Sequence, residues 1–364
     1  MTKRTPSSYQ AYTTPTDFGW NKEQEEAFTR YTGPYLAGRV ASCHKTAYDV
    51  LLPRGETVRV GASGALRRLG KIPAVGDFVV VLDQPDSGTR MIVDILPRHG
   101  TLSRGAPGGD GGSQVIAANL DTVFIVTAAG GDFNIRRLER YLAVVHASGA
   151  LPVIVINKAD IAEDADALVK ETAAIAGDTP IVMISAREEE GLAALAPFLP
   201  AGTTIALVGS SGVGKSTLIN ALLSNAVQET QDVRNYDERG RHTTTVRQLF
   251  ALPGGAMVID NPGIREIQLG NAAAGLDETF ADIAAFAADC RYRDCRHDGE
   301  PGCAVEAAVA AGLISEERLL SYRRLMKEAG FQAEKNDIGL KRLEKKKWKW
   351  VGKAGKQLRE EKGY

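Results

Sequence analysis

The sequence lacks any long hydrophobic run. No apolar stretch in its 364 residues approaches the ~20 residues that a membrane-spanning helix needs, so we expect no contact with a membrane. The N-terminal segment Met1–Tyr9 is polar and contains no apolar core of a secretory signal. These two absences lead us to expect a cytoplasmic protein.

The sequence also lacks an overall excess of charge. The formal net charge is -1, so the protein as a whole is not a basic nucleic-acid binder. Positive charge is in excess locally, in residues 331–364, which contain eleven Lys and Arg residues, five Asp and Glu residues and two tryptophans. This basic C-terminal tail suits an RNA-binding extension. A solvated, partly helical tail is the alternative with the same composition.

Cysteine is scarce and unevenly placed. Only four cysteines occur, and three of them lie between residues 290 and 303. Cys290, Cys295, His297 and Cys303 have the spacing C-x4-C-x-H-x5-C, and three thiolates with one imidazole form a closed tetrahedral shell for one structural Zn²⁺. Free cysteines beside a surface histidine are the alternative. Cys43 stands apart, and we expect it to be a small buried residue.

Aromatic residues are few in residues 35–102, which otherwise consist of short β-prone runs separated by turns. Such a pattern predicts a small barrel, with the OB-fold as the leading choice. The three aromatics Tyr35, Tyr48 and Phe78 form no visible stacking platform, so RNA binding and a purely structural role both stay open. We expect residues 1–34 to be a flexible extension, in which residues 21–30 can form a short helix, and the glycine-rich residues 103–114 to be a linker.

Residues 115–274 alternate between apolar strands and amphipathic helices. Strands are expected over 121–127, 151–156, 180–184 and 203–208, which predicts an α/β domain whose parallel sheet is covered on both faces. A helical zinc-binding domain is expected over 275–330, before the tail of residues 331–364.

The stretch from Gly209 to Ser216, G-S-S-G-V-G-K-S, matches the phosphate-binding P-loop. We expect a strand before it and a helix after it, as the motif requires. Lys215 is expected to reach the β- and γ-phosphates, and the Ser216 hydroxyl to bind Mg²⁺. The glycines let backbone N–H groups face the phosphates, and the helix N-terminus favours an anion. The other expected nucleotide contacts of this stretch are Ser210, Ser211, Gly212, Val213, Gly214 and Thr217.

Two further motifs predict that the base is guanine. Asn157-Lys-Ala-Asp160 follows a strand, and the Asp160 carboxylate can accept hydrogen bonds from guanine N1–H and N2, a donor pair that adenine lacks. Asn157 is expected to contact N7, and the stem of Lys158 to cover the base. Ser185 and Ala186 follow the next strand, where backbone N–H groups can meet guanine O6.

Downstream motifs predict the remaining phosphate and Mg²⁺ contacts. Asp260 begins a D-x-P-G sequence and is expected to hold Mg²⁺ through water, while the Gly263 N–H meets the γ-phosphate. A switch I loop is expected around Arg241-His-Thr-Thr-Thr245. We favour Thr244 as its Mg²⁺ ligand, and Thr243 and Thr245 remain alternatives.

The order of these motifs is permuted. Both base motifs (G4 and G5) precede the P-loop (G1), switch I (G2) and switch II (G3), which predicts a circularly permuted P-loop GTPase fold. Together with the OB-like segment and the Cys/His cluster, this arrangement resembles the RsgA (YjeQ) family of bacterial GTPases that assist maturation of the small ribosomal subunit. One variation is Asn261, where Thr or Ser is more usual.

Catalysis needs a group that orients the attacking water. Ile264 follows the D-x-P-G motif and cannot do so, whereas His242 adjoins the switch I threonines and can. The resemblance implies the same role for His242, which would act with Lys215 and Thr244. A solvated loop histidine is the alternative. No arginine finger is identifiable.

The resemblance further implies a late-stage assembly factor. Such a protein binds the small ribosomal subunit and its rRNA, is stimulated by that subunit, and is controlled in binding and release by GTP or GDP. Two other classes of protein share some of these features. A P-loop kinase or ATPase is disfavoured by the base motifs, and a non-enzymatic OB/zinc RNA-binding protein is disfavoured by the intact P-loop. A monomer is the default expectation.

Overall fold

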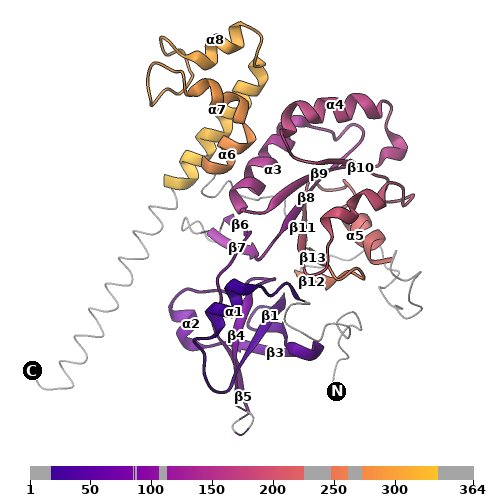
Figure 1. Cartoon of the computed structure of the whole chain (residues 1–364), viewed down its shortest axis with the longest axis vertical. Helices are drawn as coiled ribbons and strands as arrows, with labels where there is room; N and C mark the ends of the chain where they lie inside the picture. Colours follow the sequence, from indigo (N-terminus) through magenta and orange to yellow (C-terminus); the bar gives the residue numbers. More distant parts are fainter. Residues whose placement is uncertain are drawn as a thin grey trace, which may run out of the picture. The chain divides into compact units, whose positions relative to one another are not determined.

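The computed structural model describes residues 18–84, 86, 88–105, 113–224, 247–260 and 273–334. Two compact units are present: the first contains residues 1–102 and 115–265, and the second contains residues 103–114 and 266–364. The first unit holds a β-barrel and an α/β sheet, and the second holds mostly helices (Figure 1).

The chain packs against the barrel before the first strand begins. Helix α1 (Lys22–Phe28) is capped by Asn21, whose side chain accepts a hydrogen bond from the Glu23 N–H at 2.8 Å. Trp20 is buried and meets Phe78 of the barrel edge to face, with ring centroids 5.3 Å apart. Residues 18–34 are therefore packed onto the barrel, unlike the flexible extension expected there, because their scattered aromatics bury apolar surface.

The barrel has five strands in the order β1-β2-β3-β5-β4, and β4 pairs back with β1 to close it. All its pairings are antiparallel except that of β3 with β5. Its core is aliphatic, with Val50, Val79, Val81 and Ile92 fully buried. The expected OB-like barrel is thus confirmed. Its elements are β1 (Tyr35–Cys43), β2 (Tyr48–Leu51), η3 (Pro53–Gly55), β3 (Thr57–Ala62), α2 (Gly64–Arg68), β4 (Phe78–Gln84) and β5 (Thr89–Ile95).

The α/β part has the strand order β10-β9-β8-β11-β13-β12. The strands are parallel except β12, which runs antiparallel to β13. Every residue of β8 is buried, as expected of a strand covered on both faces. The elements are β8 (Thr122–Ala128), α3 (Ile135–Ser148), β9 (Leu151–Asn157), η5 (Ala159–Ile161), α4 (Ala165–Ala176), β10 (Ile181–Met183), η6 (Leu192–Phe198), β11 (Thr204–Val208), α5 (Lys215–Ser224), β12 (Gln248–Ala251) and β13 (Met257–Asp260).

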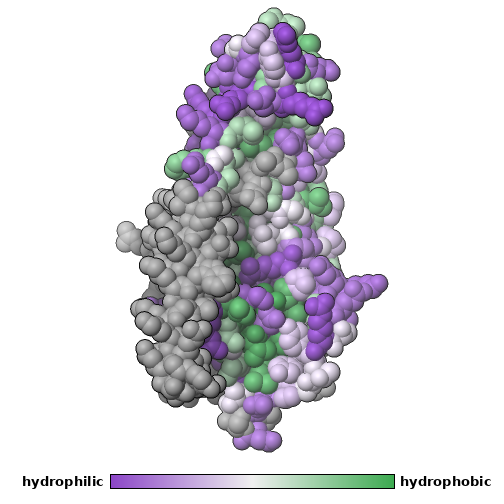
Figure 2. All heavy atoms as spheres, turned by 90° about the vertical axis from the view of Figure 1, so that its left-hand side faces the viewer, coloured by the Kyte–Doolittle hydropathy of each residue, from purple (hydrophilic) through white to green (hydrophobic). Residues whose placement is uncertain are grey.

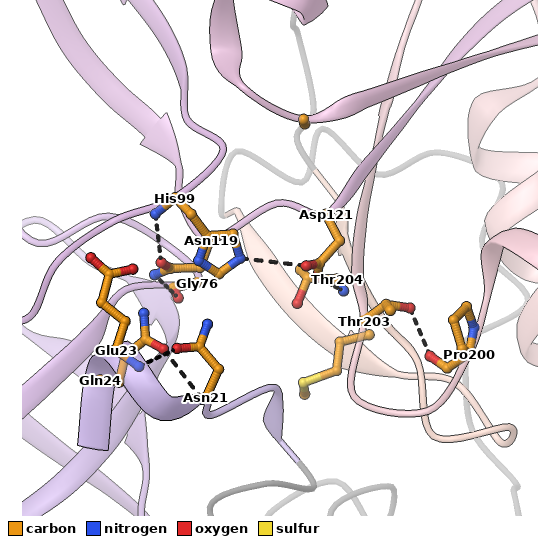
Figure 3. A network of polar contacts seen from close by, with 12 residues as sticks. Asn21, Glu23, Gln24, Gly76, His99, Asn119, Asp121, Pro200, Thr203 and Thr204 are labelled. Atoms are coloured by element: carbon orange, nitrogen blue, oxygen red, sulfur yellow. Dashed lines mark hydrogen bonds and ion pairs between the residues drawn. The ribbon is translucent and has the colours of Figure 1, made fainter. Parts of the chain in front are cut away.

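The barrel and the α/β sheet are joined by strand pairing and by polar contacts. Ser42 of β1 pairs with Gln248 of β12, so the two sheets are continuous. Figure 3 shows a network of polar contacts in which His99 faces Asp121. His99 Nε2 lies 3.5 Å from Asp121 Oδ1. The other oxygen of Asp121 accepts the Thr204 N–H at 2.7 Å, at the start of the strand that leads to the P-loop.

The segment expected to be a flexible linker is flanked by paired strands. Strands β6 (Leu102–Gly105) and β7 (Ser113–Ala117) form a two-stranded sheet of their own. The sequence predicted only a linker here, because the segment is rich in glycine. Short strands that form only when they pair with a partner strand have little signal in the local sequence.

The second unit is built from short helices and one longer one. Phe280 is fully buried and meets the Tyr322 ring at 5.3 Å, while the Arg318 guanidinium lies 4.7 Å from the Phe280 ring centre. On this unit, hydrophilic side chains predominate at the upper end of the face drawn in Figure 2. The helices are α6 (Ala273–Thr279), α7 (Ala281–Ala287), α8 (Ala304–Ala310) and a helix over 316–334. Within the described parts of the chain, no helix has the length and apolarity to span a membrane.

Candidate active site and metal centre

The P-loop lies where β11 ends and α5 begins, as the sequence predicted. Gly209 has φ 145, and a Cβ there would lie 2.1 Å from the Val126 carbonyl oxygen. Gly214 has φ 96, and a Cβ there would lie 2.2 Å from Asn157 Nδ2. Glycine is therefore required at both positions, since any side chain would collide with a neighbouring strand or motif.

Lys215 is folded onto the loop that it follows. Its Nζ donates to the carbonyl oxygens of Gly209 at 2.9 Å and Ser210 at 2.6 Å. Burial raises the pKa of Asp260, and the charge of Lys215 partly offsets this rise. The structure thus brings the expected phosphate-binding lysine near the carboxylate that is expected to hold Mg²⁺. Oxygen ligands from Ser216 and Asp260 suit a hard cation, so these residues fit that ion.

The two base motifs and the P-loop meet through the side chain of Asn157. Its Nδ2 donates to the Val213 carbonyl at 2.9 Å, and its Oδ1 accepts the Ala186 N–H at 2.9 Å. Asn157 is almost fully buried. This link between the P-loop and the two base motifs was not foreseen from the sequence; the position of Asn157 at the end of a strand whose last six residues are buried was the available signal. Its contact with guanine N7 stays a prediction.

The second base contact is oriented from the neighbouring strand. Asp160 lies in η5, and its Oδ1 accepts a hydrogen bond from the Ser185 hydroxyl at 2.6 Å. Ser185 is buried, whereas Asp160 is exposed. Lys158 has a left-handed backbone, φ 63, which turns the chain sharply after β9. The carboxylate is therefore held by one bond and open to a ligand on its solvent side.

The expected switch residues lie outside the described residues. His242, Thr244 and Gly263 fall in the gaps 225–246 and 261–272, as do Arg241, Thr243, Thr245, Asn261 and Ile264. Their roles stay predictions. Asp260 is the last described residue before the second gap.

One P-loop contact was missed altogether by the sequence reasoning. The Ser210 hydroxyl accepts a hydrogen bond from Arg137 Nη1 of α3 and is also hydrogen-bonded to Tyr141. Nothing in the sequence pattern signalled this contact, because Arg137 lies on an ordinary amphipathic helix far from the motif in sequence.

The four expected zinc ligands come together in the second unit. The ligand atoms of Cys290, Cys295, His297 and Cys303 all lie within 4.8 Å of one another. His297 Nδ1 is 3.6 Å from Cys290 Sγ and 3.4 Å from Cys303 Sγ, and the two sulfurs are 4.0 Å apart. A tetrahedral zinc shell with Zn–S near 2.3 Å has edges of about 3.8 Å. The residues thus fit a zinc ion.

The surroundings of the cluster favour the neutral imidazole and the thiolate, which are the protonation states that bind metal. Burial lowers the pKa of His297, which keeps its imidazole neutral. The Glu306 N–H donates to Cys303 Sγ at 3.4 Å, a contact that stabilises a thiolate. Arg291, Arg293 and Arg296 are exposed around the cluster, and their contact with RNA stays a prediction.

The chain is similar in sequence to known GTPases. The family profile described as RsgA GTPase matches residues 95–270. The small ribosomal subunit biogenesis GTPase RsgA of Methanosarcina acetivorans is 60% identical over 91% of this chain and 89% of its own length. The protein of the same name from Opitutus terrae is 44% identical over 93% of this chain and 96% of its own.

Solved structures agree with the sequence relatives. The crystal structure of YjeQ from Thermotoga maritima matches with a TM-score of 0.61 and 28% identity, covering 81% of this chain and 98% of that one. YloQ, described as a circularly permuted GTPase, matches with a TM-score of 0.57 and 26% identity, covering 83% and 96%. These matches confirm the permuted fold and the resemblance on which the sequence expectations rested. The chain belongs to the RsgA family of circularly permuted GTPases.

Proposed function

We propose that this protein hydrolyses GTP and acts in the biogenesis of the small ribosomal subunit. The observation that carries the proposal is the Asn157 side chain, which ties both base motifs to the P-loop in a single site. The relatives that share most of the chain's length have the name small ribosomal subunit biogenesis GTPase. A kinase or ATPase is disfavoured because Asp160 recognises a donor pair that adenine lacks.

In the proposed mechanism, GTP replaces the loop carbonyls as the partner of Lys215. The ammonium then pairs with the β- and γ-phosphates, while the backbone N–H groups of residues 212–217 surround them. Ser216 and Thr244 would bind Mg²⁺ directly and Asp260 through water, and this ion would neutralise charge on the phosphates. Gly263 would donate its N–H to the γ-phosphate, and His242 would orient the attacking water.

The other parts of the chain are proposed to serve the ribosomal partner. One zinc ion would stabilise the second unit, whose exposed arginines would face rRNA phosphates together with the basic tail of residues 331–364. Nucleotide state would then control binding to and release from the small subunit. An assembly factor of this kind acts in the cytoplasm, as a monomer on our proposal.

The decisive experiment measures GTP hydrolysis with and without purified small ribosomal subunits, with ATP as the competing nucleotide. We expect slow hydrolysis alone, strong stimulation by the subunit and no competition by ATP. If the subunit does not stimulate hydrolysis, the ribosomal role is wrong, although the GTPase activity stands. If the protein hydrolyses ATP, the assignment of guanine as the base is wrong.

The role of His242 is tested separately. His242→Ala should lower kcat by about 100-fold or more, the usual contribution of a group that handles the water's proton, and should leave the affinity for GTP nearly unchanged. Unchanged turnover would reject the role. Single alanine variants of Thr243, Thr244 and Thr245 identify the Mg²⁺ ligand, because only that variant should need more Mg²⁺ for half-maximal activity.

A further inference from the structure

Helix α3 presents two polar side chains to the P-loop. Asn134 caps this helix, and its Oδ1 accepts the Arg137 N–H at 2.9 Å. Arg137 Nη1 donates both to Asp132 Oδ1 at 2.9 Å and to the Ser210 hydroxyl. Tyr141 lies one turn further along the same face and hydrogen-bonds the same hydroxyl. Ser210 is thus held by two residues of one helix.

The main chain of Ser210 is held as well. Its carbonyl oxygen accepts a hydrogen bond from Lys215 Nζ at 2.6 Å, so helix α3 fixes the side chain while the loop's own lysine fixes the backbone. When Lys215 turns to the phosphates of GTP, the bond to that carbonyl is lost. The contacts with α3 do not involve the lysine and are therefore available in both states.

The preceding residue cannot anchor the loop. Gly209 has no side chain and has φ 145, a conformation that glycine adopts freely. Ser210 is consequently the first P-loop position at which a side chain can fix the backbone. Fixing the loop before the nucleotide arrives reduces the ordering that binding must otherwise bring about.

We propose that Arg137 is a positioning residue for GTP, which acts through Ser210 to hold the P-loop in the conformation that accepts phosphates. The proposal rests on the GTP-binding role proposed above and adds to it a residue outside all of the nucleotide motifs. Asp132 fixes the guanidinium by a second bond, so the arginine is itself oriented before it meets the loop. Tyr141 supports the same hydroxyl from a buried position.

The test measures equilibrium binding of fluorescent GDP and GTP analogues together with steady-state hydrolysis. Arg137→Ala and Ser210→Ala should each raise the Kd for both nucleotides by about ten-fold, the usual effect of losing a hydrogen bond to a charged group. For Arg137→Ala, which lies outside the nucleotide motifs, kcat should change by less than two-fold. The double variant should bind no more weakly than Ser210→Ala, because the effect of Arg137 passes through the Ser210 hydroxyl that this variant already lacks. Arg137→Lys keeps the charge but not the planar fork, so it should recover only part of the affinity.

Two further variants make the result unambiguous. Arg68→Ala removes an exposed arginine of the barrel and controls for the loss of one positive charge. Tyr141→Phe keeps the ring and removes only the hydroxyl, so it should weaken binding less than Arg137→Ala. Melting temperatures of all variants are measured in parallel, and Arg137→Lys gives the binding comparison if Arg137→Ala unfolds.

Three outcomes would overturn the proposal: Arg137→Ala binding like Arg68→Ala, multiplicative losses in the double variant, or a fall in kcat at unchanged Kd. Failure of the parent protein to bind either nucleotide would instead overturn the proposed function.

Discussion

The carboxylate of Glu300 accepts a hydrogen bond from the backbone on each side of His297. The N–H of Asp298 donates at 2.6 Å and that of Arg296 at 2.9 Å, and these bonds hold the pKa of Glu300 below its usual range. Between them, His297 has a left-handed backbone with φ 59. That conformation costs a residue with a Cβ about 1–2 kcal/mol, so Glu300 fixes the turn that aims the imidazole at the cysteines.

Replacing Glu300 is therefore expected to weaken metal binding. Glu300→Gln retains one acceptor oxygen and places an N–H₂ group against the second backbone donor, which releases the turn. The affinity for zinc should fall by about ten-fold, the lower end of the range for groups that orient metal ligands. Competition with a chromophoric chelator measures this change.

Asp294→Asn provides the matched control, because it removes another acidic charge between the zinc ligands, from an exposed side chain. Its zinc affinity should equal that of the parent. Equal affinities for Glu300→Gln and Asp294→Asn would contradict the orienting role of Glu300.

Removing the metal is expected to unfold the second unit selectively. Helices α7 and α8 have seven residues each, too few to be stable in isolation, and the ligand cluster ties the chain between them. A strong zinc chelator, with Mg²⁺ kept in excess, should lower the melting temperature of a transition that reports this unit, while GTP binding by the first unit persists. Circular dichroism with nucleotide titration measures both; an unchanged melting curve after zinc is shown to be absent would contradict this prediction.

The parts predicted from the sequence are those whose signal is local. The P-loop residues Gly209 and Gly214 need glycine because their neighbours leave no room for a Cβ, and that need is visible as a motif. The zinc ligands are likewise visible because metal geometry limits their spacing. Strand β8 was predicted because a strand buried on both faces is apolar throughout.

The parts that were missed depend on partners far away in the chain. Nothing around Ser42 indicates that it pairs with Gln248, and nothing around Arg137 indicates Ser210. Arg39 lies in a β-prone run and is 2% exposed, although an arginine there would be expected at the surface. Such contacts follow from tertiary packing, which local pattern does not encode.

Acid should remove the contribution that the Asp49 carboxylate of the barrel makes to the stability of the fold. Burial alone would raise the pKa of Asp49, but hydrogen bonds from Arg59, His44 and Ser42 outweigh it and hold the pKa below its ordinary value. An acid with a lowered folded-state pKa stabilises the fold above its unfolded pKa of about 3.9, and loses this effect as the pH falls through the folded value. Asp49→Asn should therefore destabilise the protein at pH 7.

The same difference should shrink only below about pH 4, where Asp49 becomes protonated first in the unfolded chain and, at lower pH, in the folded protein. Urea unfolding of parent and variant at a series of pH values measures it. A difference that disappears already between pH 5 and 7 would show that the group does not have a lowered pKa.

Arg39 should be required for the junction between the barrel and the α/β sheet. Its guanidinium lies 4.7 Å from the Phe78 ring centre and donates to Thr204 Oγ1 at 2.7 Å, at the start of the P-loop strand. It also donates to three backbone carbonyls, those of Phe18, Gly76 and Asn119. Arg39→Met keeps the apolar length but leaves the Phe18 and Asn119 carbonyls without that donor, whereas the Gly76 carbonyl keeps a hydrogen bond from Asn119 Nδ2 at 2.9 Å.

The loss should be about 3 kcal/mol or more in the free energy of unfolding, since each buried unsatisfied group costs about 1–3 kcal/mol. Buried ion pairs can often be replaced by apolar residues without loss, because both charges are removed together. The partners of Arg39 include backbone carbonyls, which remain when Arg39 is mutated. An apolar replacement is therefore not expected to be neutral here. Arg39→Lys, which retains fewer donors, should be intermediate in urea unfolding followed by circular dichroism. A methionine variant as stable as the parent would mean that water or a shifted backbone satisfies the carbonyls, and that the junction does not depend on this arginine.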